Sequence, residues 1–227
     1  MLKRAINLNS SSTNSDRMPM IDKQKSCEQY QNIAGTLLFI AGVVIFLGII
    51  TAETLYPGYN TAQNMISDLG ATEPPNSIIV QPSATIFNSS MMICGLCIIL
   101  SAYCIHRALY MKTVTLTIAL FGIGALGVGI FPGNYGAVHG ISALMTFIFG
   151  GLAAIMSYKV TTLPFRYFSV ILGSIALLDL MLYYILGQAS PFAIFGIGGL
   201  ERWIAYPIAL WVTGFGGYLM GSAEKSN

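Results

Sequence analysis

Hydrophobic positions fall into six long runs separated by short polar stretches. The runs carry almost no charged side chains and occupy residues 33–52, 84–105, 114–131, 141–158, 167–186 and 203–220. Each has 18 to 22 residues, close to the roughly 20 that an α-helix needs to cross the hydrocarbon core of a bilayer. None alternates apolar and polar residues with the period of two that marks a barrel strand. The pattern therefore predicts an all-α polytopic membrane protein, a bundle of six transmembrane helices.

The composition agrees with this prediction and excludes other classes. The chain has 227 residues, of which 55% are hydrophobic and 9% charged, whereas a soluble domain is about 25% charged. The net charge of +2 is too small to attract a nucleic acid. We expect a polar, mobile cytoplasmic segment over 1–32, a membrane domain over 33–221 and a short cytoplasmic tail over 222–227.

Positive charges are distributed unevenly between the two predicted sides of the membrane. Ten of the eleven lysines and arginines lie in the N-terminal segment, the second-to-third and fourth-to-fifth connections, and the tail; the exception is Arg202. The positive-inside rule therefore predicts that both termini are cytoplasmic. We expect a multi-pass protein of the plasma membrane whose connections 53–83, 132–134 and 187–202 face outward.

Most of the unusual polar side chains lie in or beside these outer connections. Two of them, His139 and Asp68, are candidates for catalysis. The others are candidates for ligand binding: Asn64, Ser67, Asn88, Asn134, Asp179, Glu201 and Arg202. We expect these residues, which come from distant segments, to meet in one patch on the outer face.

Asp179 is the acidic residue that lies deepest in a predicted span. It is about eight residues, or roughly 12 Å, from the outer end of the fifth span. A carboxylate at that depth costs about 2.5 kcal/mol or more in lipid, so Asp179 should face the interior of the bundle. A functional role and a buried structural hydrogen bond are both open for it.

Arg202 lies where a cation is unexpected. With the N-terminus inside, the second, fourth and sixth spans begin on the outer face, where helix N-termini favour anions. Arg202 should therefore have a carboxylate partner, such as Asp68 or Glu53, or a ligand anion. Three helix starts and one arginine would suit a phosphate or carboxylate, although any six-span protein of this topology has three helix starts there.

Two local patterns predict details of packing. Residues 64–70 are expected to form a short interfacial helix that ends at Gly70 and turns Met65, Ile66 and Leu69 toward the bundle or membrane. The small-xxx-small pattern formed by Gly217 and Gly221 predicts close helix packing inside the bundle, with a homodimer contact as the alternative.

Three segments of the chain resemble a known family. They are residues 64–70 (Asn-Met-Ile-Ser-Asp-Leu-Gly), 133–140 and 199–202. Together they resemble the prokaryotic six-span family catalogued as domain of unknown function 998, and the resemblance covers residues 33–221. It implies no settled activity. The family's polar motif positions correspond here to Ser67, Asp68, Asn134, His139, Glu201 and Arg202.

A more distant similarity links the Ile-Ser-Asp-x-Gly string, residues 66–70, and the pairing of Asn134 with His139 to the eukaryotic Frag–DRAM–Sfk group. Members of that group are linked to GPI-anchor lipid remodelling, autophagy and plasma-membrane lipid organisation. This similarity implies a lipid-related role.

Lipid binding is the first of several functions that these residues allow. The protein would bind a lipid headgroup or another small anion through Arg202 and the helix N-termini, with Asp68 and His139 shaping the pocket. A membrane lipid would be its partner, and a homo-oligomer is possible. We expect no cofactor and no metal, because the outer face offers one histidine and no cysteine.

The second possible function is that of a membrane-embedded lipid-modifying enzyme, either a hydrolase or an acyl transferase. His139 would be the general base, because imidazole titrates near neutral pH. Asp68 would orient it, and Arg202 would stabilise a developing oxyanion. A third possibility is a small transporter with Asp179 and Asn88 along its path.

A structural role is the alternative to all three. Asp68, His139, Glu201 and Arg202 would then form one hydrogen-bonded network. Such a network would tie the first outer connection, about 30 residues long, onto the helix ends.

Overall fold

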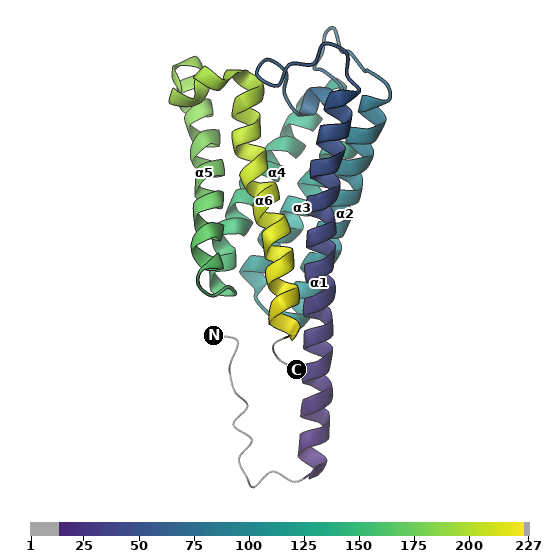
Figure 1. Ribbon diagram of the computed structural model, residues 1–227, viewed down its shortest axis with the longest axis vertical. Helices are drawn as coiled ribbons and strands as arrows, with labels where there is room; N and C mark the ends of the chain where they lie inside the picture. Colours follow the sequence, from purple (N-terminus) through teal and green to yellow (C-terminus); the bar gives the residue numbers. More distant parts are fainter. Residues whose placement is uncertain (1–13, 225–227) are drawn as a thin grey trace.

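The computed structural model describes residues 14–224, with side chains from Asp22 onward except that of Gln188, and this part of the chain is helical without strands (Figure 1). Six long helices follow one another: α1 (Asn14–Thr54), α2 (Ser83–Leu109), α3 (Lys112–Ile130), α4 (Ala137–Met156), α5 (Phe165–Leu186) and α6 (Gly196–Glu224). Short 3-10 turns lie between them: η1 (Ser67–Leu69), η2 (Gly133–Tyr135), η3 (Ser157–Lys159), η4 (Gly187–Ala189) and η5 (Pro191–Phe195).

The prediction of six membrane-spanning helices is confirmed. All six are long and apolar enough to cross a membrane. Residues 55–82, 131–136 and 187–195 connect the helices at one end of the bundle, which we call the loop end. The described start of α1 and the end of α6 lie at the opposite, terminal end (Figure 1). Which end faces the cytoplasm stays a prediction.

Five of the helices, α1, α2, α3, α4 and α6, close a ring around the interior of the bundle. α1 packs against α2 and α6, and α3 packs against α2 and α4. α4 also contacts α6 directly. α5 packs on α4 and α6 and lies outside the ring that the other five helices close (Figure 1).

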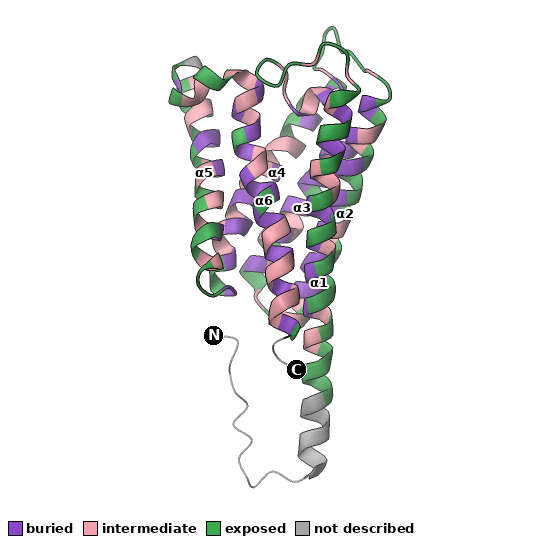
Figure 2. Ribbon diagram, viewed as in Figure 1, coloured by how far each residue is buried: buried purple, intermediate pink, exposed green. Residues whose placement is uncertain are grey.

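Buried positions recur along the helices of the bundle (Figure 2). The buried apolar residues among them form two clusters. The larger includes Trp211, whose indole N–H donates to the Ser157 hydroxyl at 3.2 Å. The smaller lies toward the loop end and contains Ile66 and Leu69 of the first long connection. Many large apolar side chains are exposed on the outer faces of the helices, for example Leu47 at 59%. Such a surface suits lipid tails better than water.

Glycines allow some helices to approach closely. A Cβ at Gly95 of α2 would lie 2.7 Å from the Leu126 Cα of α3, and one at Gly216 of α6 would lie 2.6 Å from the Gly35 carbonyl oxygen of α1. By contrast, a Cβ at Gly217 or Gly221 would meet nothing within 4 Å. The predicted close packing of that pair is therefore wrong, because Gly216 supplies the contact with α1.

The N-terminal segment continues into the first span. Residues 1–13 lie outside the described residues, and the mobility predicted for residues 1–32 stays a prediction. From Asn14 onward the segment belongs to α1. The side chain of Gln31 is buried and donates to the Leu219 carbonyl at 3.0 Å, so this part of the segment packs on α6.

Candidate functional site

The first long connection folds over the loop end of the bundle. Residues 64–70 contain one 3-10 turn, Ser67–Leu69, in place of the longer helix that the sequence predicts, and Gly70 caps it as expected. Ile66 and Leu69 are buried, at 5% and 0% exposed. These apolar anchors hold the neighbouring polar residues against the ends of the helices.

Arg202, in the second turn of α6, joins this connection to the helix. Its Nη1 donates to the carbonyl oxygens of Thr61 at 2.8 Å and Asn64 at 3.0 Å in the connection, and to that of Gly198 at 2.8 Å in α6. The backbone N–H of Gly198 in turn donates to the Ala62 carbonyl at 3.0 Å. Hydrogen bonds from the Arg202 guanidinium and from the Gly198 backbone N–H therefore hold the connection against the start of α6.

The other terminal nitrogen of Arg202 has acidic and phenolic partners. Nη2 donates to Glu53 Oε1 at 2.6 Å and to the Tyr59 hydroxyl at 2.7 Å. Burial raises the pKa of Tyr59, although Arg202 opposes this; its neutral hydroxyl donates to the Met65 carbonyl at 2.7 Å. We call the group of Arg202 and its acceptors the clasp: Glu53, Tyr59, Thr61, Asn64 and Gly198.

The clasp shows which carboxylate balances the positive charge of Arg202. The side chains of Arg202 and Glu53 are only 10% and 19% exposed, and the expected carboxylate partner is therefore Glu53. Asp68, the other candidate partner, accepts from the Met65 N–H at 2.8 Å. Burial raises the pKa of Asp68, and hydrogen bonds from Met65 and the Asn64 side chain oppose the rise.

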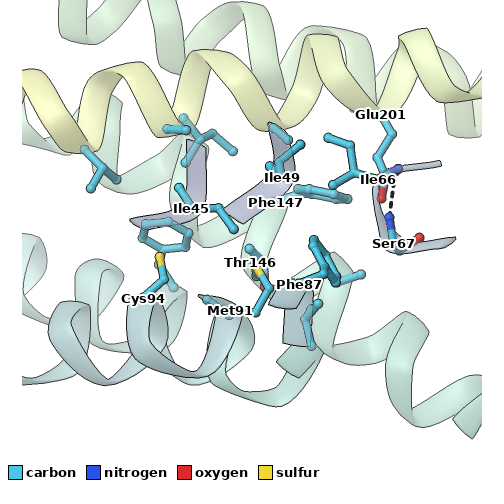
Figure 3. A pocket seen from close by; sticks show the side chains of 18 of the residues that line it. Ile45, Ile49, Ile66, Ser67, Phe87, Met91, Cys94, Thr146, Phe147 and Glu201 are labelled. Carbon is cyan, nitrogen blue, oxygen red and sulfur yellow. Dashed lines mark hydrogen bonds between the residues drawn. The ribbon is translucent and has the colours of Figure 1, made fainter. Parts of the chain in front are cut away.

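Glu201 is the neighbour of Arg202, yet its carboxylate has different partners. Its Oε2 accepts from the backbone N–H groups of Ile66 and of Ser67, the latter at 3.3 Å (Figure 3). Successive helical residues point about 100° apart. As a result, Arg202 reaches the clasp while Glu201 reaches the turn at Ser67.

His139 lies in the first turn of α4 and is 4% exposed. Its Nδ1 is 2.8 Å from the Phe131 carbonyl oxygen. Because a carbonyl oxygen only accepts, we assign the proton to Nδ1. The neutral ring then presents Nε2 as an acceptor, and no described residue donates a hydrogen bond to it.

Ser67 and Glu201 line one end of an apolar cavity inside the ring (Figure 3). His139, in the first turn of α4, also lines this cavity. The cavity has a volume of about 80 Å³. Its remaining walls come from five helices and from the connection: Ile45, Ile49, Ile66, Phe87, Met91, Cys94, Phe121, Ala125, Val128, Ala143, Thr146, Phe147, Ala205, Ile208, Ala209 and Val212. Nearly all of these side chains are apolar.

A second space, which we call the chamber, lies between α4, α5 and α6 at the loop end. It shares Ser67, His139, Ala143, Phe147 and Glu201 with the cavity. Its other lining residues add one carboxylate and two phenols to an apolar wall: Met65, Glu73, Gly140, Leu144, Leu180, Tyr183, Tyr184, Ile197, Leu200 and Ile204.

A groove between α4 and α5 continues from the chamber. It shares Leu144, Leu180 and Tyr184 with the chamber. Its remaining lining residues are apolar: Ile148, Leu177 and Met181. The chamber therefore shares walls with both the cavity and the groove.

The other predicted site residues lie outside these three spaces. Asn134 is exposed in η2. The side-chain oxygen of Asn88 and both carboxylate oxygens of Asp179 are buried with no hydrogen-bond partner among the described residues. The structure thus brings together Ser67, His139 and Glu201, and it places Asn64 and Arg202 in the clasp.

Sequence reasoning missed part of the chamber. Tyr183 and Tyr184, at the end of α5, and the small residue Gly140 were not predicted to line a site. The two adjacent tyrosines at the boundary of a span were the available signal, because aromatic residues also mark the membrane interface. Among the side chains that the structure describes from Asp22 to Glu224, no group of three or more His, Cys, Asp or Glu residues is arranged to hold a metal ion.

Six apolar helices, five of which surround a polar-capped cavity, define a multi-pass membrane protein. The family model described as "Protein of unknown function (DUF998)" matches residues 39–218, and the chain belongs to that family. Comparisons with curated proteins and with solved structures gave no match. The more distant similarity to the Frag–DRAM–Sfk group stays a prediction.

Proposed function

We propose that this protein binds a membrane lipid, with an apolar chain in the cavity and the polar headgroup in the chamber. The observation that supports this most directly is the cavity itself. Its apolar walls end at Ser67, His139 and Glu201, so it matches a molecule that is apolar along its length and polar at one end.

The groove supplies the route by which such a molecule would enter. Its walls are formed by α4 and α5, and Met181 and Tyr184 are 51% and 67% exposed on the outside of the bundle. A lipid could pass from the bilayer between these helices without its chain entering water. α5 contacts α4 and α6 and lies outside the ring, so it borders this route.

The hydrogen bonds of the clasp change which residues we assign to headgroup binding. The sequence suggested that Arg202 would hold an anion, but its terminal nitrogens donate to Glu53, Tyr59 and backbone carbonyls. An anion would have to displace these partners. We therefore assign headgroup binding to the chamber residues, and Arg202 to the positioning of the connection.

The enzyme alternative draws less support from the geometry. The enzyme hypothesis paired His139 as general base with Asp68 as the residue that orients it. The Nδ1 of His139 instead lies on the Phe131 carbonyl, while Asp68 accepts from Met65. Lipid binding without chemistry uses the same residues and needs no catalytic pair.

Native mass spectrometry of the purified full chain tests the proposal. The protein is prepared in mild detergent with added oleyl alcohol, and the bound lipid is counted per chain. Ala205→Phe fills the cavity from α6, because Ala205 lines the cavity and not the chamber. Ala137→Phe makes the same change at an exposed position of α4 that lines neither space and serves as the matched control.

We expect one bound lipid in the wild type and in Ala137→Phe, and at least a tenfold loss in Ala205→Phe, roughly the cost of a poorly accommodated side chain in a packed site. Equal lipid in both variants would show that the bound molecule lies elsewhere. Absence of a bound lipid in the wild type would refute the proposed function.

A further inference from the structure

We infer that the chamber selects lipids whose headgroup carries a protonated amine. This inference rests on the proposed function and names the class of lipid. It follows from the chemical character of the polar atoms that the chamber presents, which are acceptors of hydrogen bonds and carriers of negative charge.

His139 provides the first of these acceptors. With Nδ1 donating to the Phe131 carbonyl at 2.8 Å, the neutral imidazole can only accept through Nε2. His139 is buried, at 4% exposed, and it lines both the cavity and the chamber. A buried acceptor without a protein donor favours a ligand that brings one.

Glu201 provides the second hydrogen-bond acceptor of the chamber. Its Oε2 accepts two backbone N–H groups, those of Ile66 and Ser67, whereas Oε1 accepts no hydrogen bond from the described residues. A carboxylate has lone pairs on both oxygens, so Oε1 is available to a donor in the chamber. A charged donor there forms a stronger hydrogen bond than a neutral one does.

The charged residues around the chamber also favour a ligand with a positive charge. Glu73 lines its outer edge, and Asp68 lies close enough to both Glu73 and His139 to interact electrostatically. Among the described residues that line the chamber there is no lysine or arginine. The nearby cation, Arg202, is paired with Glu53. An anionic headgroup would therefore meet the carboxylates of Glu201 and Glu73 with no cation lining the chamber, and an ammonium group would be attracted by them.

Three amphiphiles with the same eighteen-carbon chain test this inference: oleylamine, oleyl alcohol and oleate. Binding of each to the full chain in mild detergent is titrated by native mass spectrometry at neutral pH. We expect oleylamine to bind about tenfold more tightly than oleyl alcohol, the usual advantage of a charged donor over a neutral one. Oleate should bind most weakly.

Variants assign the preference to the chamber. Glu201→Gln removes the charge but keeps a side-chain oxygen for Ile66 and Ser67, and it should bring oleylamine to within about twofold of oleyl alcohol. Glu73→Gln, at an exposed position, should weaken the preference partly without affecting folding. Glu224→Gln, exposed at the terminal end of α6, is the matched control and should change nothing.

The outcomes separate the two proposals. If all three amphiphiles bind equally and Ala205→Phe abolishes their binding, lipid binding stands and the amine preference is overturned. Tightest binding of oleate also overturns it. If no amphiphile binds the wild type, both proposals fail. Should Glu201→Gln fail to fold, the ranking in the wild type and the effect of Glu73→Gln decide.

Discussion

Glu201 and Arg202 are consecutive residues of one helix, yet they belong to two polar regions of opposite character. In the clasp, both terminal nitrogens of Arg202 donate to protein acceptors. In the chamber, Glu201 Oε1 and His139 Nε2 accept nothing from the described residues. A polar group whose hydrogen bonds are made within the protein supports the fold, whereas one with unused capacity in a cavity is a candidate for binding. Polarity alone would not have separated them.

The largest expected effect is on the clasp. Arg202→Ala should lower the free energy of unfolding by about 3–5 kcal/mol, the usual result of removing one partner of a buried ion pair. Thermal unfolding in mild detergent measures this. The fraction that remains folded should still bind oleyl alcohol as the wild type does, and a selective loss of binding with normal stability would place Arg202 in the binding site instead.

A double-mutant cycle sharpens this prediction. Glu53→Gln removes the charge that Arg202 balances. If the two groups act as one pair, the double variant Arg202→Ala/Glu53→Gln should lose clearly less stability than the two single losses added together. Simple additivity would contradict the clasp.

The chamber should respond in the opposite way. His139→Leu removes the Nε2 acceptor and should weaken oleylamine binding about tenfold, while the unpaired Phe131 carbonyl should cost about 1 kcal/mol of stability. His106→Leu, near the terminal end of α2, makes the same change far from the chamber. Binding titration and thermal unfolding of both variants give the two quantities side by side. Equal binding by His139→Leu and His106→Leu would remove His139 from the site.

A smaller effect is expected on lipid exchange. A Cβ at Gly140 would meet nothing within 4 Å, and Gly140 lines the chamber. Gly140→Leu should therefore narrow the route from the groove and slow exchange of bound oleyl alcohol several-fold. Stability should not fall, because leucine favours the helix by about 0.5–1 kcal/mol over glycine. Gly217→Leu, equally unhindered at the other end, should leave exchange unchanged when both are followed by displacement mass spectrometry.

The smallest effect concerns Asp68, which belongs to neither region. Its pKa in the folded protein is raised above the ordinary value of 3.8 by burial. Its carboxylate therefore costs no stability below that pH, and the cost grows as pH rises through the raised pKa. Thermal unfolding should show stability falling over this window in the wild type and a shallower fall in Asp68→Asn. Identical slopes would assign the pH dependence to other groups.

The helices followed from the sequence, but the division of the polar residues did not. Long apolar runs predict spans because a helix satisfies its own backbone in lipid, and all six were confirmed. The pairing of Arg202 with Glu53 was among the stated alternatives. The chamber could not be predicted, because it depends on how α5 packs on α4 and α6 and on the 100° between Glu201 and Arg202. The failed expectation for Gly217 has the same origin, since a shift of one residue changes the helix face.

The length of α1 has a practical consequence for visualising so small a protein. Its candidate span, Asp22–Thr54, has 33 residues, or about 50 Å of helix, more than the roughly 40–45 Å of a whole bilayer including headgroups. The helix extends past the ends of its neighbours at the terminal end (Figure 1). A rigid soluble scaffold joined in helical register at Asp22 would turn with the bundle and provide an alignment marker for electron cryomicroscopy, far from both the clasp and the chamber.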